Sequence, residues 1–187
     1  MKYHNITHDD MRNGDGLRVV LWVSGCSHQC EGCQNPITWN PDYGLKYDIS
    51  ATHEILNELE KDYISGLTIS GGDPFHPNNI LEILALCRFV KDVTIDKTIW
   101  VYTGYTWEFL HECLDFPESL WNYIDVLVDG EFEQDKADVN YPWAGSTNQR
   151  VIDVQESLKL GKVVLYASDK ERWYSRGFQP AKDCCCG

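Results

Sequence analysis

One stretch decides the fold: Gly25-Cys26-Ser27-His28-Gln29-Cys30-Glu31-Gly32-Cys33-Gln34-Asn35. The apolar run 17–23 precedes it and is typical of a buried strand, so the three thiols lie on the loop at the end of that strand. Glycines within this cysteine loop give its backbone the freedom to wrap a metal centre. Zinc sites usually close a tetrahedron with four protein ligands, and iron–sulfur clusters are usually held by four cysteines. The loop alone is therefore one ligand short of a closed site.

Strand, loop and helix alternate along the rest of the chain. Further strands are predicted from apolar runs, over 66–70, 98–102, 124–128 and 162–166. Helices are predicted from apolar residues at helical spacing, starting at Ser50 and Ile80 and lying within 107–113 and 151–160. Residues 1–16 are predicted to be a short lead-in that ends in a turn. The order implies parallel strands with right-handed crossover helices. Because the units are too few for an eightfold barrel, we predict an α/β fold built as an open, partial (β/α) barrel.

Short turns end the strands that follow the cysteine loop. They are Gly71-Gly72-Asp73-Pro74, Thr103-Gly104-Tyr105 and Asp129-Gly130. Paired glycines let a backbone approach a ligand closely, and the adjoining Asp73 can hold an amino group. The polar, turn-rich segment 131–149 is consistent with a functional loop. Because chemistry collects at the carboxyl ends of parallel strands, the sequence predicts one site at a single edge of the sheet.

The C-x₃-C-x₂-C spacing after a first strand resembles the cluster motif of radical S-adenosylmethionine (SAM) enzymes. The fuller string 25–35 resembles the anaerobic ribonucleotide reductase activating proteins, a family of glycyl-radical activating enzymes. Further matches to that family are Gly-Gly-Asp-Pro at 71–74, Tyr-Thr-Gly-Tyr at 102–105, Val-Asp-Gly at 128–130 and Ser-Thr-Asn-Gln-Arg at 146–150. The resemblance spans residues 3–168 and implies the open barrel of a radical SAM domain over 1–170. Residues 171–187 are then a flexible, cysteine-rich tail.

The resemblance also implies which residues hold the cofactors. Cys26, Cys30 and Cys33 would bind a [4Fe–4S] cluster and leave its fourth iron open to SAM. The segment that contacts the methionyl amine of SAM in radical SAM enzymes is matched by Ser70, Gly71, Gly72 and Asp73. Candidate contacts for the ribose, adenine or carboxylate of SAM are Thr103, Gly104 and Asp129.

The activity that the resemblance implies is that of a radical SAM oxidoreductase. One electron from the reduced cluster would cleave SAM into methionine and a 5′-deoxyadenosyl radical. That radical would take a hydrogen atom from a glycine of anaerobic ribonucleotide reductase and leave a glycyl radical. The implied partners are this reductase and an electron donor such as flavodoxin or ferredoxin. No catalytic side chain is predicted beyond the cluster and SAM, because the cofactor performs the difficult chemistry and the protein positions it.

Other interpretations of the same residues stay open. The cysteine loop could be a structural zinc site with His28 or a distant thiol as the fourth ligand. The strand-end turns could contact no ligand, since such turns are common. Arg150 could pair with a carboxylate or be solvated, and the face on which Asp125 lies is not fixed by strand alternation. The chain could also activate a different glycyl-radical enzyme, or be a non-catalytic metal-binding adaptor.

Composition narrows the class of protein further. The formal net charge of −13 argues against nucleic-acid binding. No apolar stretch reaches the length of a membrane span and no secretory signal is recognisable, so we expect a soluble, cytoplasmic protein. Eight cysteines in such a chain favour metal or redox chemistry over a disulfide framework.

The cysteines outside the loop have separate interpretations. Cys87 and Cys113 lie on helical patterns and are predicted to be small buried hydrophobes. Cys184, Cys185 and Cys186 belong to the tail, where they could bind a second metal, act as a thiol reductant or supply a transient ligand. An exposed and dispensable tail is the interpretation that we favour.

Overall fold

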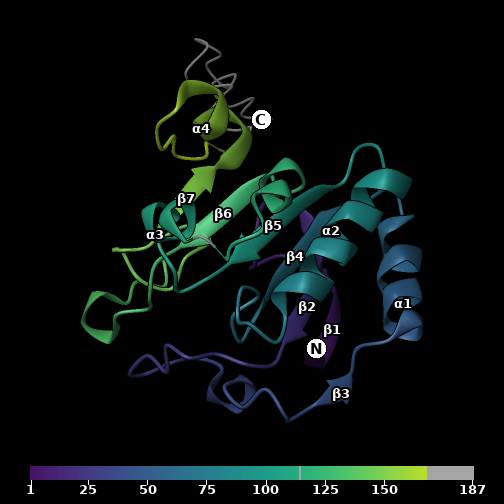
Figure 1. The fold of residues 1–187 in the computed structure, drawn as a ribbon, viewed down its shortest axis with the longest axis horizontal. Helices are drawn as coiled ribbons and strands as arrows, with labels where there is room; N and C mark the ends of the chain where they lie inside the picture. Colours follow the sequence, from purple (N-terminus) through teal and green to yellow (C-terminus); the bar gives the residue numbers. More distant parts are fainter. Residues whose placement is uncertain (114, 168–187) are drawn as a thin grey trace, which may run out of the picture.

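The computed structural model describes residues 1–113 and 115–167, which form a mixed α/β fold (Figure 1). In these residues one seven-stranded sheet has the strand order β3-β1-β2-β4-β5-β6-β7. The strands are β1 Lys2–Asp10, β2 Leu17–Val23, β3 Leu45–Lys46, β4 Ile64–Gly71, β5 Thr98–Tyr102, β6 Val126–Asp129 and β7 Arg150–Asp153. The α-helices are α1 Ile49–Leu59, α2 Ile80–Val93, α3 Trp107–Glu112 and α4 Val154–Leu160. Short 3₁₀ helices are η1 Pro36–Thr38, η2 Glu118–Asn122 and η3 Gln134–Lys136.

The middle of the sheet is parallel. Strands β2, β4, β5 and β6 run in the same direction, with Leu21 opposite Ile69 and Ile69 opposite Val101. Helices α1, α2 and α3 connect successive members of this group, and α1 and α2 lie on the same side of the sheet (Figure 1). The parallel strands and crossover helices predicted from the repeat are therefore confirmed in the centre of the fold. The turns that follow these strands meet along one edge.

Both edges of the sheet differ from the prediction because they are antiparallel. Residues 2–10 were predicted to be a lead-in, but they form strand β1, which pairs with β2. Ile6 is the one buried residue of this strand, so its sequence shows no clear apolar pattern. Strand β7 lies where a helix was predicted, and α4 begins only at Val154, after Asp153 has capped it. The strand predicted over 162–166 is present only as a bridge from Leu165 to Ile152, with backbone hydrogen bonds on either side of it to β7.

The other elements follow their predicted ranges closely, with small differences at the ends. Helix α1 begins one residue before Ser50, and its cap is Asp48, whose carboxylate accepts the backbone N–H groups of the first turn. Cys87 is fully buried as predicted, whereas Cys113 is only partly buried. The carboxylate of Asp125, whose face the sequence left open, accepts hydrogen bonds from Lys91 and from the backbone of Ile99.

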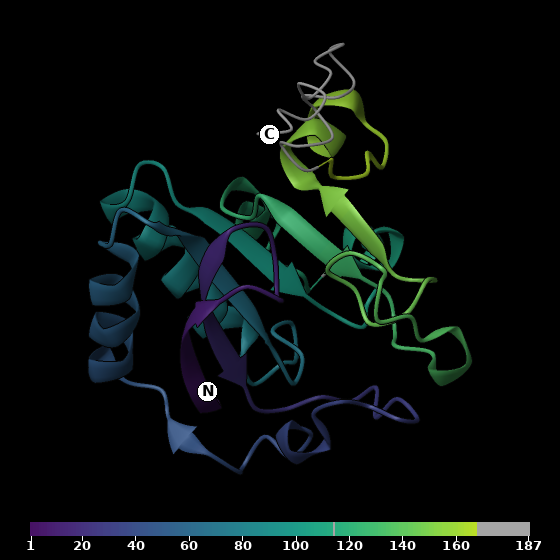
Figure 2. The ribbon, with the colours of Figure 1, turned by 180° about the vertical axis from the view of Figure 1, so that it is seen from behind.

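The two faces of the sheet are filled differently. Alternate residues such as Val19, Leu67 and Ile99 pack beneath the helices in the main hydrophobic core. Figure 2 shows the opposite face, which these helices leave uncovered. Arg18 is 1% exposed and lies over the Trp100 ring at 5.2 Å. All five N–H donors of this guanidinium are used, by Asp15 O, Leu67 O, Thr68 Oγ1, Thr98 O and Thr98 Oγ1. Arg18 therefore ties strands β2, β4 and β5 together.

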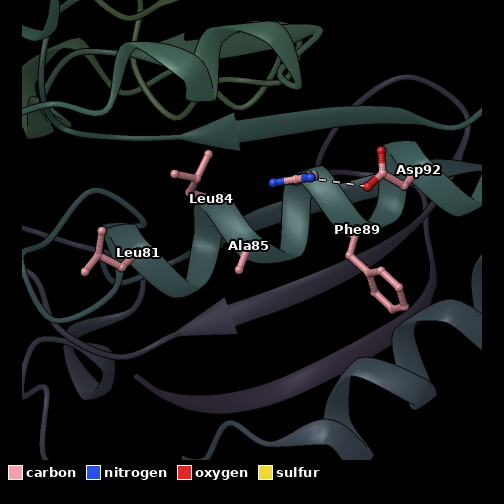
Figure 3. Close-up of a pocket in the computed structure, with 6 residues that line it drawn as sticks. Leu81, Leu84, Ala85, Phe89 and Asp92 are labelled. Atoms are coloured by element: carbon pink, nitrogen blue, oxygen red, sulfur yellow. Dashed lines mark ion pairs between the residues drawn. The ribbon is translucent and has the colours of Figure 1, made fainter.

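The outward side of α2 carries a shallow apolar depression, lined by Leu81, Leu84, Ala85, Arg88, Phe89 and Asp92 (Figure 3). Leu81 is 69% exposed and Phe89 is 41% exposed. Within the described residues, none of the helices is both long and apolar enough to cross a membrane.

Candidate functional site

The cysteine loop leaves β2 at the carboxyl edge of the sheet and is anchored at its base. Gly25 N donates to Thr38 O at 2.7 Å, and Cys26 N donates to Trp39 O at 3.0 Å. Gly25 has a φ of +101°, a conformation that favours glycine. The three thiols are partly buried and free of disulfides, and burial raises the pKa of both Cys26 and Cys30.

The donor set suits a cluster better than a single ion. Among the described residues, no three His, Cys, Asp or Glu side chains converge as ligands of one metal ion. A cubane takes each thiolate on a different iron, so its ligands need not meet at one point. Cys26, Cys30 and Cys33 lie on one partly buried loop and supply the soft thiolate ligands that iron–sulfur clusters take. The chemistry of these residues therefore fits a [4Fe–4S] cluster.

The Gly-Gly-Asp segment after β4 packs directly against the base of this loop. Gly72 N donates to Val23 O at 2.8 Å, and Asp73 N donates to Gly25 O at 2.7 Å. A Cβ on Gly72 would lie 2.5 Å from Gly25 O, and one on Gly71 would lie 2.8 Å from the backbone of Val23. These glycines are therefore required by the close approach of the two backbones.

The carboxylate of Asp73 is 1% exposed and is used within the protein. It accepts hydrogen bonds from Phe75 N at 2.8 Å, from Thr103 Oγ1 at 3.0 and 2.9 Å, and from Gly104 N at 3.0 Å. Asp73 thus joins the end of β4 to the end of β5. Within the described residues the hydroxyl of Ser70, one position before the glycines, has no hydrogen-bond partner, so it is available to a ligand.

His28 brings the cysteine loop into the same network. Its Nδ1 lies 2.8 Å from Oε1 of Glu131, and its Nε2 lies 3.1 Å from Oδ2 of Asp73. The second contact is close but lacks the geometry of a hydrogen bond. Asp73 and Glu131 raise the pKa of His28, with Asp73 the larger cause, while burial opposes the shift. The imidazole also lies edge-on to Tyr105, with ring centroids 4.4 Å apart.

Asp129, at the end of β6, is also 1% exposed and engaged internally. Its Oδ2 accepts from Trp107 N at 2.8 Å, and Arg150 binds both of its carboxylate oxygens. The same guanidinium holds Glu108 through two hydrogen bonds of 3.0 and 2.7 Å, which lower the pKa of that carboxyl. Of the two interpretations of Arg150, pairing with a carboxylate is the one that the structure supports.

The segment 131–149, which follows β6, lies beside the cysteine loop at this edge (Figure 1 and Figure 2). The Gln134 side chain occupies the space over Gly32, where a Cβ would lie 1.6 Å from Oε1. An open depression of about 460 Å³ adjoins these contacts and is lined by Ser27, His28, Gly104, Tyr105, Thr106, Phe109 and Glu131. A functional role is predicted for this segment from its polar, turn-rich composition, but neither Glu131 nor Gln134 is singled out, since both lie in irregular structure where periodicity gives no signal.

A family model described as a 4Fe-4S single cluster domain matches residues 12–152. The anaerobic ribonucleoside-triphosphate reductase-activating protein of Vibrio cholerae serotype O1 is 46% identical over 151 residues, which is 80% of this chain and 96% of that protein. This chain belongs to that family. Activating proteins of the same name from Enterobacteria phage T4 and Escherichia coli (strain K12) are 41% and 40% identical, covering 81% of this chain and 93% and 97% of their own lengths.

Membership of the activating-protein family confirms the resemblance drawn from the cysteine loop. The matched range 12–152 contains that loop, the Gly-Gly-Asp segment, the Thr-Gly turn after β5 and Asp129. The residues that the structure gathers at one edge of the sheet are therefore also those that the iron–sulfur family model spans.

Proposed function

We propose that this protein is a radical SAM activase that generates a glycyl radical on anaerobic ribonucleotide reductase. In the proposed reaction, one electron and SAM give methionine and a 5′-deoxyadenosyl radical, which takes a hydrogen atom from a glycine Cα of the reductase. The by-product is 5′-deoxyadenosine. The observation that carries the proposal is the single loop with three thiols, placed beside the Gly-Gly-Asp segment at the carboxyl edge of the parallel strands.

Cys26, Cys30 and Cys33 are the proposed cluster ligands. When bound, a [4Fe–4S] cluster with three protein thiolates supplies the reducing electron and an iron open to the amine and carboxylate of SAM. The protein's part is to position the ligand and exclude competing reactions. Gly72 lets its backbone approach that of Gly25, which fixes the loop relative to the strand ends.

The proposed SAM contacts lie on neighbouring strand ends: Ser70, Gly71, Gly72, Asp73, Thr103, Gly104 and Asp129. Ser70 supports this placement because its hydroxyl is unpartnered within the described residues. Asp73 and Asp129 are buried and bonded to neighbouring elements, so their carboxylates hold the strand ends in place for the groups that face SAM.

The proposed substrate is another protein. The depression beside the cysteine loop is open, which suits a peptide loop from a partner better than an enclosed small molecule. The names of the relatives support anaerobic ribonucleotide reductase as that partner. A cytoplasmic electron donor such as flavodoxin or ferredoxin would supply the electron. We propose the open, partial barrel of a radical SAM domain over residues 1–170, with 171–187 as its tail; Cys184, Cys185 and Cys186 lie outside the described residues.

The test is anaerobic reconstitution with iron and sulfide, followed by dithionite reduction with and without SAM. A cubane signal in electron paramagnetic resonance (EPR) that changes when SAM is added, together with 5′-deoxyadenosine, would support the proposal. Tight zinc binding with no cubane and no SAM cleavage would overturn it in favour of a metal-binding adaptor. Glycyl-radical formation on the anaerobic reductase, compared with another glycyl-radical enzyme, separates the two activase functions.

A further inference from the structure

His28 lies at the middle of the cysteine loop and faces carboxylates on two sides. One is Glu131, at 2.8 Å from Nδ1, and the other is Asp73, at 3.1 Å from Nε2. Both ring nitrogens therefore lie next to a carboxylate oxygen, and Nδ1 forms a hydrogen bond with Glu131. This arrangement argues against His28 as the fourth ligand of a zinc site.

The surroundings of the imidazole are closely fitted. A Cβ added to Gly104 would lie 2.5 Å from Cδ2 of His28, so the ring rests directly on the backbone after β5. The His28 side chain is only 9% exposed, whereas its neighbours Ser27 and Gln29 are exposed. One residue of the loop is thus inserted into the strand-end network while the residues on either side face solvent.

We infer that His28 is a positioning residue, which fastens the cysteine loop to Asp73 and Glu131 and thereby sets the spacing of the three thiolates. The inference rests on the proposed function, because the spacing matters only if the loop binds a cluster. A loop with glycines at 25 and 32 has many accessible conformations, and a buried side chain held by two carboxylates removes most of them. Groups that orient metal ligands typically change metal retention by about 10- to 100-fold when they are removed.

The contact with Asp73 also links the loop to the proposed SAM segment. The backbone N–H of Asp73 donates to Gly25 O at 2.7 Å, while its carboxylate binds Thr103 and faces His28. The cysteine loop and the Gly-Gly-Asp segment are therefore held as one unit at two points. Loss of His28 removes the side-chain contact and leaves the backbone contact, beside which Asn79 Nδ2 donates to both Ser24 O and Asp73 O. The environment of the cluster should therefore respond differently to SAM.

The experiment compares three variants with the parent protein: His28→Gln, Glu131→Gln and His8→Gln. His8 is the matched control, because it contacts Glu54 at 3.0 Å between β1 and α1, outside the site. After reconstitution, the visible absorbance of the cluster is followed during challenge with an iron chelator. EPR spectra of the reduced protein are recorded with and without SAM. Amide hydrogen exchange over residues 24–40 is measured on the apoprotein.

His28→Gln should still assemble a cluster, since the thiols remain, but should lose it to the chelator about tenfold faster. Its EPR response to SAM should change, and residues 24–40 should exchange faster. Glu131→Gln should show the same changes to a smaller extent. Because the Glu131 side chain is 58% exposed, this variant should fold, and it can be measured if His28→Gln does not fold. His8→Gln should match the parent in every measurement.

Two negative outcomes have different meanings. If the parent assembles a cubane and both site variants match it in chelator resistance, EPR response and exchange, the role of His28 is refuted while the proposed function stands. If the parent assembles no cubane, the proposed function fails, and unchanged hydrogen exchange in His28→Gln apoprotein would independently refute the fastening of the loop.

Discussion

Replacing Arg18 by Met tests whether this buried cation holds the parallel strands together. The guanidinium donates five hydrogen bonds to uncharged acceptors, and two of them, to Thr68 Oγ1 at 2.6 Å and Leu67 O at 2.8 Å, are fully buried. Each buried acceptor left without a partner costs about 1–3 kcal/mol. Part of this cost is offset in the variant, because it no longer buries a cation. Burial of the Arg18 guanidinium is unfavourable and lowers its pKa to about 10. We expect a net loss of about 3 kcal/mol in the free energy of unfolding, against a total of about 5–15 kcal/mol for a typical domain.

The assay is urea unfolding of the reduced apoprotein, followed by far-ultraviolet circular dichroism. Arg88→Met is the matched control, because the Arg88 side chain is 68% exposed and only approaches Asp92 at 3.7 Å. That control should change the free energy of unfolding by no more than about 0.5 kcal/mol. An Arg18→Met variant with the same unfolding midpoint and slope as the control would refute the assignment of Arg18 as a structural tie.

Alanine at any one of Cys26, Cys30 and Cys33 should abolish the cubane EPR signal and SAM cleavage. Cys87→Ala is the control and should keep both, because this thiol is buried in the core and its pKa is raised to about 12. Full activity in a loop variant would contradict the ligand assignment. Gly72→Ala should lower the free energy of unfolding by about 1–3 kcal/mol, since its Cβ would meet Gly25 O at 2.5 Å; an unchanged urea midpoint would argue against that close contact. Arg150 lowers the pKa of Glu108 below its usual 4.5, so the stability from this pair is fully present above that pH and is lost as pH falls through the lowered value. Arg150→Met should therefore flatten the acid side of a stability–pH profile, and an unchanged profile would count against the coupling. Truncation after Lys182 should leave cluster assembly and SAM cleavage intact; loss of the cluster would contradict a dispensable tail.

The centre of the fold was predictable from the sequence because its strands are buried on both faces. The apolar runs 17–23 and 98–102 coincide with β2 and β5, and each is followed by a glycine-containing turn. Strand β1 gave no such signal, because it lies near the edge of the sheet and buries only Ile6. Strand β7 is four residues long and runs directly into α4, so its apolar residues were assigned to the helix. Short edge strands depend on pairing with neighbours, which local sequence does not encode.

The candidate site was predictable as a set of residues but not as a set of contacts. The turns after β4, β5 and β6 were placed at one edge by the parallel repeat, and the structure brings them together there. The sequence does not show which groups each side chain forms hydrogen bonds with. Asp73 is predicted to hold an amino group of a ligand, yet its oxygens bind Thr103 and Gly104. Such pairings join residues that are distant in the chain, and no periodicity marks them.

The two buried acids at the strand ends perform the same structural task. Asp73 links β4 to β5, and Asp129 links β6 to α3 and, through Arg150, to β7. Because their oxygens are already engaged, recognition of a ligand at this edge passes to backbone groups and to small side chains such as Ser70. Glycine is needed beside each acid for a different reason: Gly72 allows the end of β4 to pack against the cysteine loop, and Gly130 has a φ of +95°, which favours glycine. The carboxylates must therefore be in place before any ligand binds, so their loss should loosen two elements at once and not merely weaken one contact.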